Sequence, residues 1–228
     1  MRARRLVRSS LTSRSHELVD VVRRTAGIHA QVQASAELQL AARVESITQA
    51  DVRAALWEDR TLVKAWTLRG TLHLHPAADL PLWLAVRPPR EELEEWRDPA
   101  GVLHPRVRAG EAAEIVSAVW DVASDEPLLR DELTAAVVRR VGKKHEGRLR
   151  SGFSFFTGDL CQGPPRGNKI TLVRPDRWLG SWKAVPRAAA LREAARRFLS
   201  AYAPATRADF RTWLGVDAGF DGVDVEEV

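Results

Sequence analysis

The sequence predicts an α+β fold that is mainly helical, carries small β-hairpins and is built from repeated units. Three observations predict it. Helix-forming segments with a shared pattern begin at residues 46, 127 and 204, which are 81 and 77 residues apart. A longer amphipathic pattern precedes each segment, and runs typical of β-strands follow the first two. Repetition at this spacing indicates similar small domains in tandem.

The three repeated segments share the features of a helix start. They read SITQADVRAALW (Ser46–Trp57), PLLRDELTAAVV (Pro127–Val138) and PATRADFRTWLG (Pro204–Gly215). Each opens with a capping or first-turn residue, has an acidic residue about five positions on, and continues with apolar residues at helical spacing. We therefore expect one helix in each segment.

The surroundings of these segments predict the type of domain. Amphipathic helices are expected upstream at Glu17–Ala26, Glu111–Val122 and Ala188–Tyr202. A further helix is expected from about Gly147, with Leu149, Phe153, Phe156 and Leu160 on one face, and GPPRGN then breaks the chain before a strand at Lys169–Arg174. In the first unit, LVKAWTLR and TLHLHP predict a hairpin with a tight turn at Gly70. Three helices followed by a hairpin is the order of a winged-helix domain.

The expected organisation is therefore one of tandem winged-helix domains. The first unit covers residues 1–90, the second 91–183, and an incomplete third unit 184–228. The third is expected to be incomplete because the residues after Trp213 contain neither a basic helix nor the hairpin that forms a wing. Either the unit is truncated or this tail is foreign to it.

Composition favours an ordinary globular protein. Of the 228 residues, 45% are hydrophobic and 29% are charged, and no apolar run reaches the roughly 18 residues that span a bilayer. The basic N-terminus is not followed by the apolar stretch of a secretory signal, so a cytoplasmic protein is expected, and a nucleoid-associated one if it binds DNA. Cys161 is the only cysteine, which excludes an internal disulfide and a cysteine-rich zinc site.

Positive charge is concentrated in one stretch. The net charge is +5 and the isoelectric point is near 10.0. The stretch between residues 139 and 150 contains one glutamate and six basic residues, a local sum of +5. These six are Arg139, Arg140, Lys143, Lys144, Arg148 and Arg150. A basic patch on a nearly neutral body predicts contacts with nucleic-acid phosphates, and the alternative is a solvated helix face.

The segment TAGIHAQVQAS, residues 25–35, is the candidate for chemistry. Gly27 fits the end of the preceding helix, and Ser35 is the expected N-cap of the next one. An extended chain between them would turn His29, Gln31 and Gln33 to one side, with Ile28, Ala30 and Val32 toward the core. If the helix began earlier, the two glutamine side chains would diverge by about 200°. The alternative interpretation is that Gln31 and Gln33 are ordinary surface or turn residues without a function.

Two neutral amides are unusual groups for hydrolysis, which mostly uses carboxylates. They suit a purine alkylated at N7, because that base already carries positive charge and leaves without protonation by an acid. The protein then has to orient a water molecule, and an amide oxygen accepts its hydrogen bond while an amide NH₂ anchors a phosphate or sugar oxygen.

The first hairpin contributes further candidates. Arg69, Thr71, His73 and His75 alternate with Leu72 and Leu74, so a polar face is expected there. We interpret Arg69 and His73 as DNA contacts, the alternative being a hairpin whose polar groups are satisfied by water and neighbouring loops. Two histidines without a third ligand argue against a metal site.

Several stretches together resemble a known family. They are GIHAQVQASAELQLAAR, ALWEDRTLVKAWTLRGTLHLHPAADLPLW, GDLCQGPPRGNKITLVRPDRWLG and YAPATRADFRTWLG. In this order, over nearly the whole chain, they resemble the AlkZ-like winged-helix DNA glycosylases. The family signature is Gln, an apolar residue, then Gln or Asp, and Gln31-Val32-Gln33 matches its double-glutamine form.

The resemblance implies three tandem winged-helix units around a DNA channel, with Gln31 and Gln33 as catalytic residues. It implies a monofunctional glycosylase that excises N7-alkylpurines from double-stranded DNA or unhooks interstrand cross-links, without a cofactor. The alternative interpretation is a winged-helix DNA-binding regulator without catalysis, since the fold serves regulation more often. A protein-interaction module is a third interpretation, which fits poorly with the basic stretch.

Overall fold

The computed structural model describes residues 6–8, 10–87, 96–97, 103–104, 109–150, 160–180 and 183–224. The chain forms two compact units. The first combines residues 1–87 with residues 183–228, and the second covers residues 88–182. The fold is a mixture of helices and antiparallel strands, as the sequence predicts at this level.

Three short helices pack into one hydrophobic core of the first unit. They are α2 (Leu18–Arg24), α3 (Gln33–Ala41) and α4 (Gln49–Trp57). Helix α4 lies inside the first repeated segment, and it begins at a capping box in which Thr48 and Asp51 satisfy each other's backbone N–H groups. The acidic residue that the repeat pattern places near the helix start therefore has a structural purpose.

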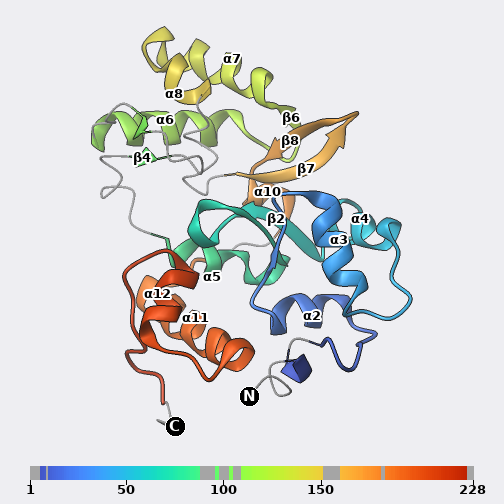
Figure 1. Ribbon diagram of the computed structural model, residues 1–228. Helices are drawn as coiled ribbons and strands as arrows, with labels where there is room; N and C mark the ends of the chain where they lie inside the picture. Colours follow the sequence, from blue (N-terminus) through green and yellow to red (C-terminus); the bar gives the residue numbers. More distant parts are fainter. Residues whose placement is uncertain are drawn as a thin grey trace. The chain divides into compact units, whose positions relative to one another are not determined.

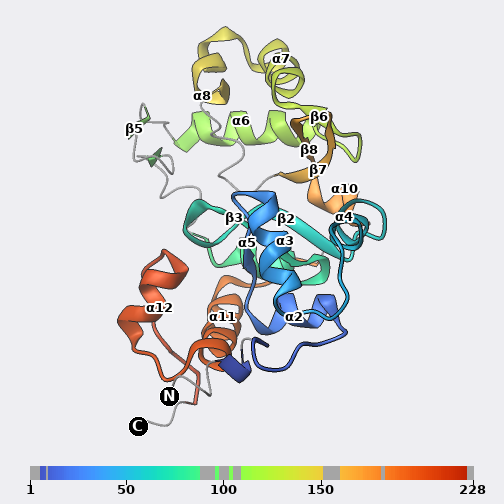
Figure 2. The same ribbon diagram turned by 45° about the vertical axis from the view of Figure 1, so that its right-hand side comes forward.

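Three strands of the first unit pair antiparallel. Strand β3 (Leu72–Pro76) pairs with β1 (Ile28–His29) and with β2 (Leu62–Trp66). Because Lys64 is opposite Leu74 and Ala65 is opposite His73, the hairpin has two distinct faces. Figure 2 shows α3 in front of these strands. One hairpin face contributes Leu62 and Leu74 to a core with residues of α2, α3 and α4.

The hairpin turn is longer than the sequence predicts. Strand β2 ends at Trp66 and β3 begins at Leu72, with a 3₁₀ turn at Leu68–Gly70 between them. Arg69 has a φ of 54° and Gly70 a φ of 67°, so two successive residues are left-handed. The expected tight turn is therefore a wider loop that exposes Arg69 at its tip.

The C-terminal helices form a second hydrophobic core together with residues 68–86 of the same unit. Helix α5 (Leu80–Ala85) packs against α11 (Arg187–Tyr202), and α12 (Arg207–Leu214) completes the cluster (Figure 1). Aromatic rings fill this core, among them Trp83, Phe198 and Phe210. Helix α12 begins at a second capping box, between Thr206 and Asp209, as in the repeat pattern. Residues of the expected third unit thus pack directly on the first.

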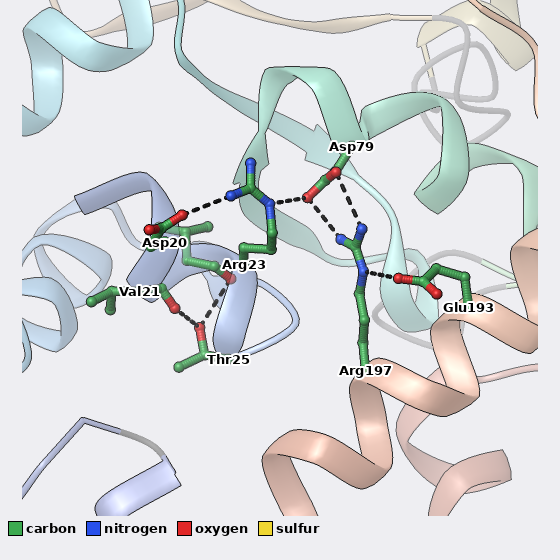
Figure 3. A network of polar contacts seen from close by, with 8 residues as sticks. Asp20, Val21, Arg23, Thr25, Asp79, Glu193 and Arg197 are labelled. Atoms are coloured by element: carbon green, nitrogen blue, oxygen red, sulfur yellow. Dashed lines mark hydrogen bonds and ion pairs between the residues drawn. The ribbon is translucent and has the colours of Figure 1, made fainter. Parts of the chain in front are cut away.

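An ionic network also joins α2 and α11 to Asp79, the last residue of the 3₁₀ turn η2 (Ala77–Asp79) and the N-cap of α5 (Figure 3). The Asp79 carboxylate accepts hydrogen bonds from Arg23 and Arg197, with Oδ2 at 3.3 Å and 2.7 Å respectively. Arg197 also donates to Glu193 at 2.9 Å. The Asp79 side chain is 13% exposed and that of Arg197 18%, so these bonds are only weakly screened by solvent. The network holds the C-terminal helices to the rest of the unit.

The second unit has the expected order of elements. The helices are α6 (Ala109–Val122), α7 (Arg130–Val141), the 3₁₀ turn η4 (Lys143–His145), α8 (Glu146–Arg150) and α10 (Pro175–Trp178). Its strands are β4 (Trp96–Arg97), β5 (Leu103–His104), β6 (Leu128–Leu129), β7 (Cys161–Arg166) and β8 (Lys169–Val173). Helices α6 and α7 pack against each other, and β8 pairs antiparallel with β6 and β7.

Two details of the second unit differ from the predictions. The prolines and glycines after Cys161 were expected to break the chain, but residues 161–166 form strand β7, with a bulge between Gly163 and Arg166. The bulge accommodates the prolines, which cannot donate to a ladder. Leu160, which was expected on the face of the helix that begins near Gly147, is not helical, while Phe153 and Phe156 lie outside the described residues.

Candidate active site

Helix α3 begins earlier than Ser35. Gln33 is its first residue, and Val32 is the N-cap, with φ −109° and ψ 120°. The carbonyl of Val32 accepts from the N–H groups of Ser35 and Ala36. Val32 is 62% exposed, so the prediction that it faces the core is wrong, whereas Ile28 and Ala30 are buried as predicted. The run from Gln33 through Ala36 is rich in helix-forming residues, which extends the helix backward.

The earlier helix start does not separate the two glutamines. Gln31 lies outside the helix, and its Oε1 accepts from the backbone N–H of Leu72 at 3.3 Å. Gln33 Oε1 accepts from Lys64 Nζ at 3.0 Å. Lys64 and Leu72 lie on adjacent strands, two residues apart in register. Both amides are therefore anchored on one hairpin, β2–β3.

A charged network surrounds the Gln33 amide. Its Nε2 donates to Glu37 Oε1 at 3.2 Å, one helical turn further on. Arg53 Nε donates to the same carboxylate oxygen at 3.2 Å. The Glu37 side chain is 4% exposed, and its Oε2 accepts no hydrogen bond from the described part of the chain. We call Gln33, Glu37, Lys64 and Arg53 the α3–β2 network.

Burial shapes the electrostatics of this network. Lys64 is 6% exposed, and burial lowers the pKa of its ammonium to about 8, with the opposite charge of Glu37 acting against that shift. Gln33 is half-buried and Gln31 is exposed. The site therefore pairs one solvent-facing amide with one amide held between an ammonium and a carboxylate.

The sequence analysis missed Lys64 and Glu37. A lysine within the apolar strand LVKAW is the available signal for Lys64, because strand β2 is buried at every position. Glu37 follows Gln33 by four residues, the spacing at which side chains on a helix meet. That signal needs the helix start at Gln33, and the expected N-cap at Ser35 concealed it.

His73 lies inside the molecule. The alternation of the hairpin places His73 and His75 on one face, as predicted, but they are only 3% and 0% exposed. His73 meets the edge of His29 and stacks on His75, which in turn stacks on Trp83. Burial lowers the pKa of His73 to about 4, so the ring is neutral at pH 7. Burial and neutrality both argue against the prediction of His73 as a DNA contact.

The neighbouring residues of this histidine stack are closely packed. Thr67 Oγ1 is 2.9 Å from His75 Nε2. Gly27, which has a φ of +107°, passes so close that a Cβ there would lie 2.5 Å from His75 Cε1. Any other residue would collide, so Gly27 is required both by its backbone angle and by this contact. The stack thereby fixes the start of the segment that carries the glutamines.

Arg69 remains at the surface of the first unit. Its side chain is exposed and its Nη1 donates to the carbonyl oxygen of Trp213. Gly215 packs against Arg69, since a Cβ at Gly215 would lie 2.9 Å from the Arg69 Cα. The hairpin tip is thus attached to the end of helix α12.

The basic stretch of the second unit is partly neutralised by acidic neighbours. Arg140 pairs with Asp121 at 2.6 Å, Lys144 with Glu114 at 3.2 Å, and Arg150 with Glu146 at 2.8 Å. Arg139 and Lys143 are exposed and form no ion pair with any described residue. The Arg148 side chain lies outside the described residues. Arg139 and Lys143 are therefore the cations best placed to bind an external anion.

Membrane-spanning helices and metal-binding clusters are both missing from the described part of the chain. Within the described ranges, no helix has the length and hydropathy needed to cross a membrane. No cluster of three or more His, Cys, Asp or Glu side chains with metal-binding geometry occurs there either. Cys161 is buried, and burial raises the pKa of its thiol far above the ordinary value.

Nearly the whole chain is similar to known DNA glycosylases. A family model described as DNA glycosylase AlkZ-like matches residues 22–224. The interstrand DNA cross-link repair glycosylase of Streptomyces sahachiroi is 33% identical over 211 residues, covering 87% of this chain and 55% of the relative. The solved structure of DNA glycosylase AlkZ from the same organism is similar, with a TM-score of 0.71 and 29% identity, covering 93% of this chain and 63% of that one. The chain thus spans less than two thirds of each relative, and the extent of the family match shows that it belongs to the AlkZ-like DNA glycosylase family.

Proposed function

We propose that this chain is a monofunctional DNA glycosylase that hydrolyses the N-glycosidic bond of N7-alkylated purines in double-stranded DNA, including bases joined in interstrand cross-links. The observation that carries the proposal is the anchoring of Gln31 and Gln33 on one hairpin, in a member of a glycosylase family. The named relative is a cross-link repair glycosylase, which supports the choice of substrate.

The two amides take different roles in this proposal. Gln33 Oε1 has two lone pairs, and Lys64 occupies one of them, so the second can accept a hydrogen bond from the attacking water. The Gln31 oxygen is bound to the Leu72 backbone, which leaves its NH₂ group to anchor a phosphate or sugar oxygen. Gln33 orients the nucleophile and Gln31 orients the nucleotide.

The chemistry suits neutral side chains. An N7-alkylated purine carries a positive charge, and breaking the bond between C1′ and N9 returns the electron pair to the base and neutralises it. Water attacks C1′ and loses its proton to solvent. No general acid is needed for the leaving group, so positioning and electrostatic stabilisation supply the rate enhancement.

The order of elements supports DNA binding through winged-helix domains. In the second unit, α6, β6, α7, α8 and the β7–β8 hairpin follow one another in the order of that fold. We propose that Arg139 and Lys143, near the end of α7, contact DNA phosphates, and that Arg69 does so from the first hairpin. Each phosphate neutralised strengthens binding by counterion release.

The test is the release of free N7-methylguanine from a methylated duplex, measured by mass spectrometry under single-turnover conditions. The proposal predicts base release with an abasic site as the other product. Sodium borohydride should trap no covalent adduct, because no amine attacks the sugar. A trapped adduct would replace hydrolysis by a lyase reaction, and binding without any base release would leave a DNA-binding protein without catalysis.

A further inference from the structure

We propose that Lys64 and Glu37 are positioning residues of the reaction, which hold the Gln33 amide with its oxygen in the orientation needed to accept from the attacking water. This inference rests on the proposed function. It adds two charged side chains that the glutamine motif does not contain, one from strand β2 and one from the second turn of helix α3.

The contacts of Gln33 permit only one orientation of its amide. Its oxygen faces the Lys64 ammonium at 3.0 Å, and its nitrogen faces the Glu37 carboxylate at 3.2 Å. Turning the amide by 180° would place its NH₂ against the ammonium and its oxygen against the carboxylate. A pair of donors and a pair of acceptors would then oppose each other, and both charge-assisted hydrogen bonds would be lost. The network thus decides which amide atom is the acceptor.

The same contacts make the Gln33 oxygen a stronger acceptor. A carboxylate that accepts from the amide nitrogen shifts electron density toward the carbonyl oxygen, because hydrogen bonds in series polarise one another. Glu37 is held in place for this contact by Arg53, which donates to the same oxygen, Oε1. Glu37 thus acts through Gln33, and it is a positioning residue without contact to the nucleotide.

Burial distinguishes these two residues from ordinary surface charges. Lys64 is 6% and Glu37 is 5% exposed, and such residues are almost never buried unless they are paired. Glu37 Oε2 is buried and accepts no hydrogen bond from the described residues, which costs stability. Apolar side chains would pack here with a smaller loss of folding free energy. Among the described residues, Gln33 is the hydrogen-bonding partner that Lys64 and Glu37 have in common, so its orientation accounts for the presence of both charges.

The charges that surround Lys64 predict a pH dependence. Glu37 on α3 is the carboxylate that acts on it, with Arg53 of α4 behind. On β3, His73 and His75 lie on the opposite face of the hairpin, because Leu74 is the partner of Lys64 in register, and burial keeps both imidazoles neutral. Loss of the Lys64 proton, at a pKa of about 8, therefore removes the ammonium that holds Gln33.

The kinetic test uses single-turnover release of N7-methylguanine by the full chain between pH 6 and pH 10. We expect Lys64→Met and Glu37→Gln each to lower the rate about tenfold or more, with an unchanged Kd for the duplex. The wild-type rate should fall above about pH 8 and that of Lys64→Met should not. The exposed residues Lys183 and Glu58 provide the matched controls Lys183→Met and Glu58→Gln, which should match wild type.

A double-mutant comparison asks whether Lys64 acts through Gln33. In a Gln33→Ala background, Lys64→Met should lower the rate no further, because the amide it orients is gone. An equal fold-loss in both backgrounds would show that Lys64 acts elsewhere and would overturn the inference. If Gln33→Ala itself releases base at the wild-type rate, the proposed function fails at its site, which is a different result.

A spectroscopic measurement keeps the inference testable if a variant does not fold. In wild-type protein, the side-chain NH₂ resonances of Gln33 should shift with a midpoint near pH 8 as Lys64 loses its proton. The corresponding resonances of Gln49, an exposed first residue of helix α4, serve as the control and should not shift. Gln33 resonances that stay constant up to pH 10 would contradict the coupling.

Discussion

Lys64 Nζ lies 3.0 Å from Gln33 Oε1, although the two residues are 31 positions apart in the chain. The contact joins the start of helix α3 to the middle of strand β2, two elements whose apolar residues share one hydrophobic core. The glutamine motif by itself is a short, partly exposed segment. In the mechanism we propose, its chemistry depends on the buried charge of Lys64, so the stability and the protonation of this unit should affect activity.

The Asp79 network predicts a large loss of stability on substitution. Asp79→Asn removes the charge that binds Arg23 and Arg197, and the Arg197 side chain is only 18% exposed. We expect the free energy of unfolding to fall by about 2 kcal/mol, because the half-buried Arg197 loses the carboxylate that accepts two of its hydrogen bonds and keeps only Glu193. Urea denaturation measures the change. Asp217→Asn is the control, since Asp217 pairs with Arg211 at 85% exposure and should change stability by less than about 0.5 kcal/mol. Equal effects of the two substitutions would contradict this role of Asp79.

The histidine stack predicts destabilisation by acid. In the unfolded state His73 binds a proton with the ordinary pKa of 6.5, whereas in the folded state its pKa is about 4. The contribution of neutral His73 to the free energy of unfolding is therefore fully present above pH 6.5. It is lost as the pH falls from 6.5 toward 4, which lowers the free energy of unfolding by roughly 3 kcal/mol. Denaturation at several pH values should show a smaller dependence for His73→Phe. His16→Gln, at a side chain 80% exposed, should keep the wild-type dependence. A wild-type stability that is constant between pH 6.5 and pH 4 would exclude a buried neutral His73.

Local sequence patterns predicted much of this fold. The capping boxes at Thr48 and Thr206 agree with the repeated acidic residue, because capping depends on neighbours a few positions apart. The alternation of the first hairpin also correctly placed His73 and His75 on one face. What the pattern could not supply is the environment of that face. Helix α5 covers it with Trp83, so a face that alternation alone makes polar is buried.

The candidate site was predicted only in part, for a similar reason. Gln31 and Gln33 are recognisable as a motif, but the groups that orient them come from the tertiary structure. Lys64 reaches Gln33 only because strand β2 packs beside α3. Charge counting likewise identified the basic stretch but not its ion pairs, since Glu114 and Asp121 lie on helix α6, about 20 to 30 residues earlier in the chain.

The ion pairs of the basic stretch predict unequal contributions to DNA binding. Arg139→Ala and Lys143→Ala should each flatten the slope of log K against log salt concentration by about 0.9, the value for one phosphate contact. Lys144→Ala should have a smaller effect, because Lys144 is already paired with Glu114 at 3.2 Å. Fluorescence anisotropy with an undamaged duplex between 50 and 300 mM salt provides the slopes. An unchanged slope for Arg139→Ala and Lys143→Ala together would remove these residues from the DNA-binding surface.

In the proposed mechanism the Gln33 amide orients the attacking water, and a comparison of two glutamine substitutions tests this role. Gln33→Ala and Gln49→Ala each truncate a glutamine at the first position of a helix, α3 and α4 respectively. The measurement is the single-turnover rate of N7-methylguanine release, with duplex binding measured in parallel. We expect a loss of about 100-fold for Gln33→Ala at unchanged affinity for the duplex, and a wild-type rate for Gln49→Ala. Equal rates for Gln33→Ala and wild-type protein would contradict it.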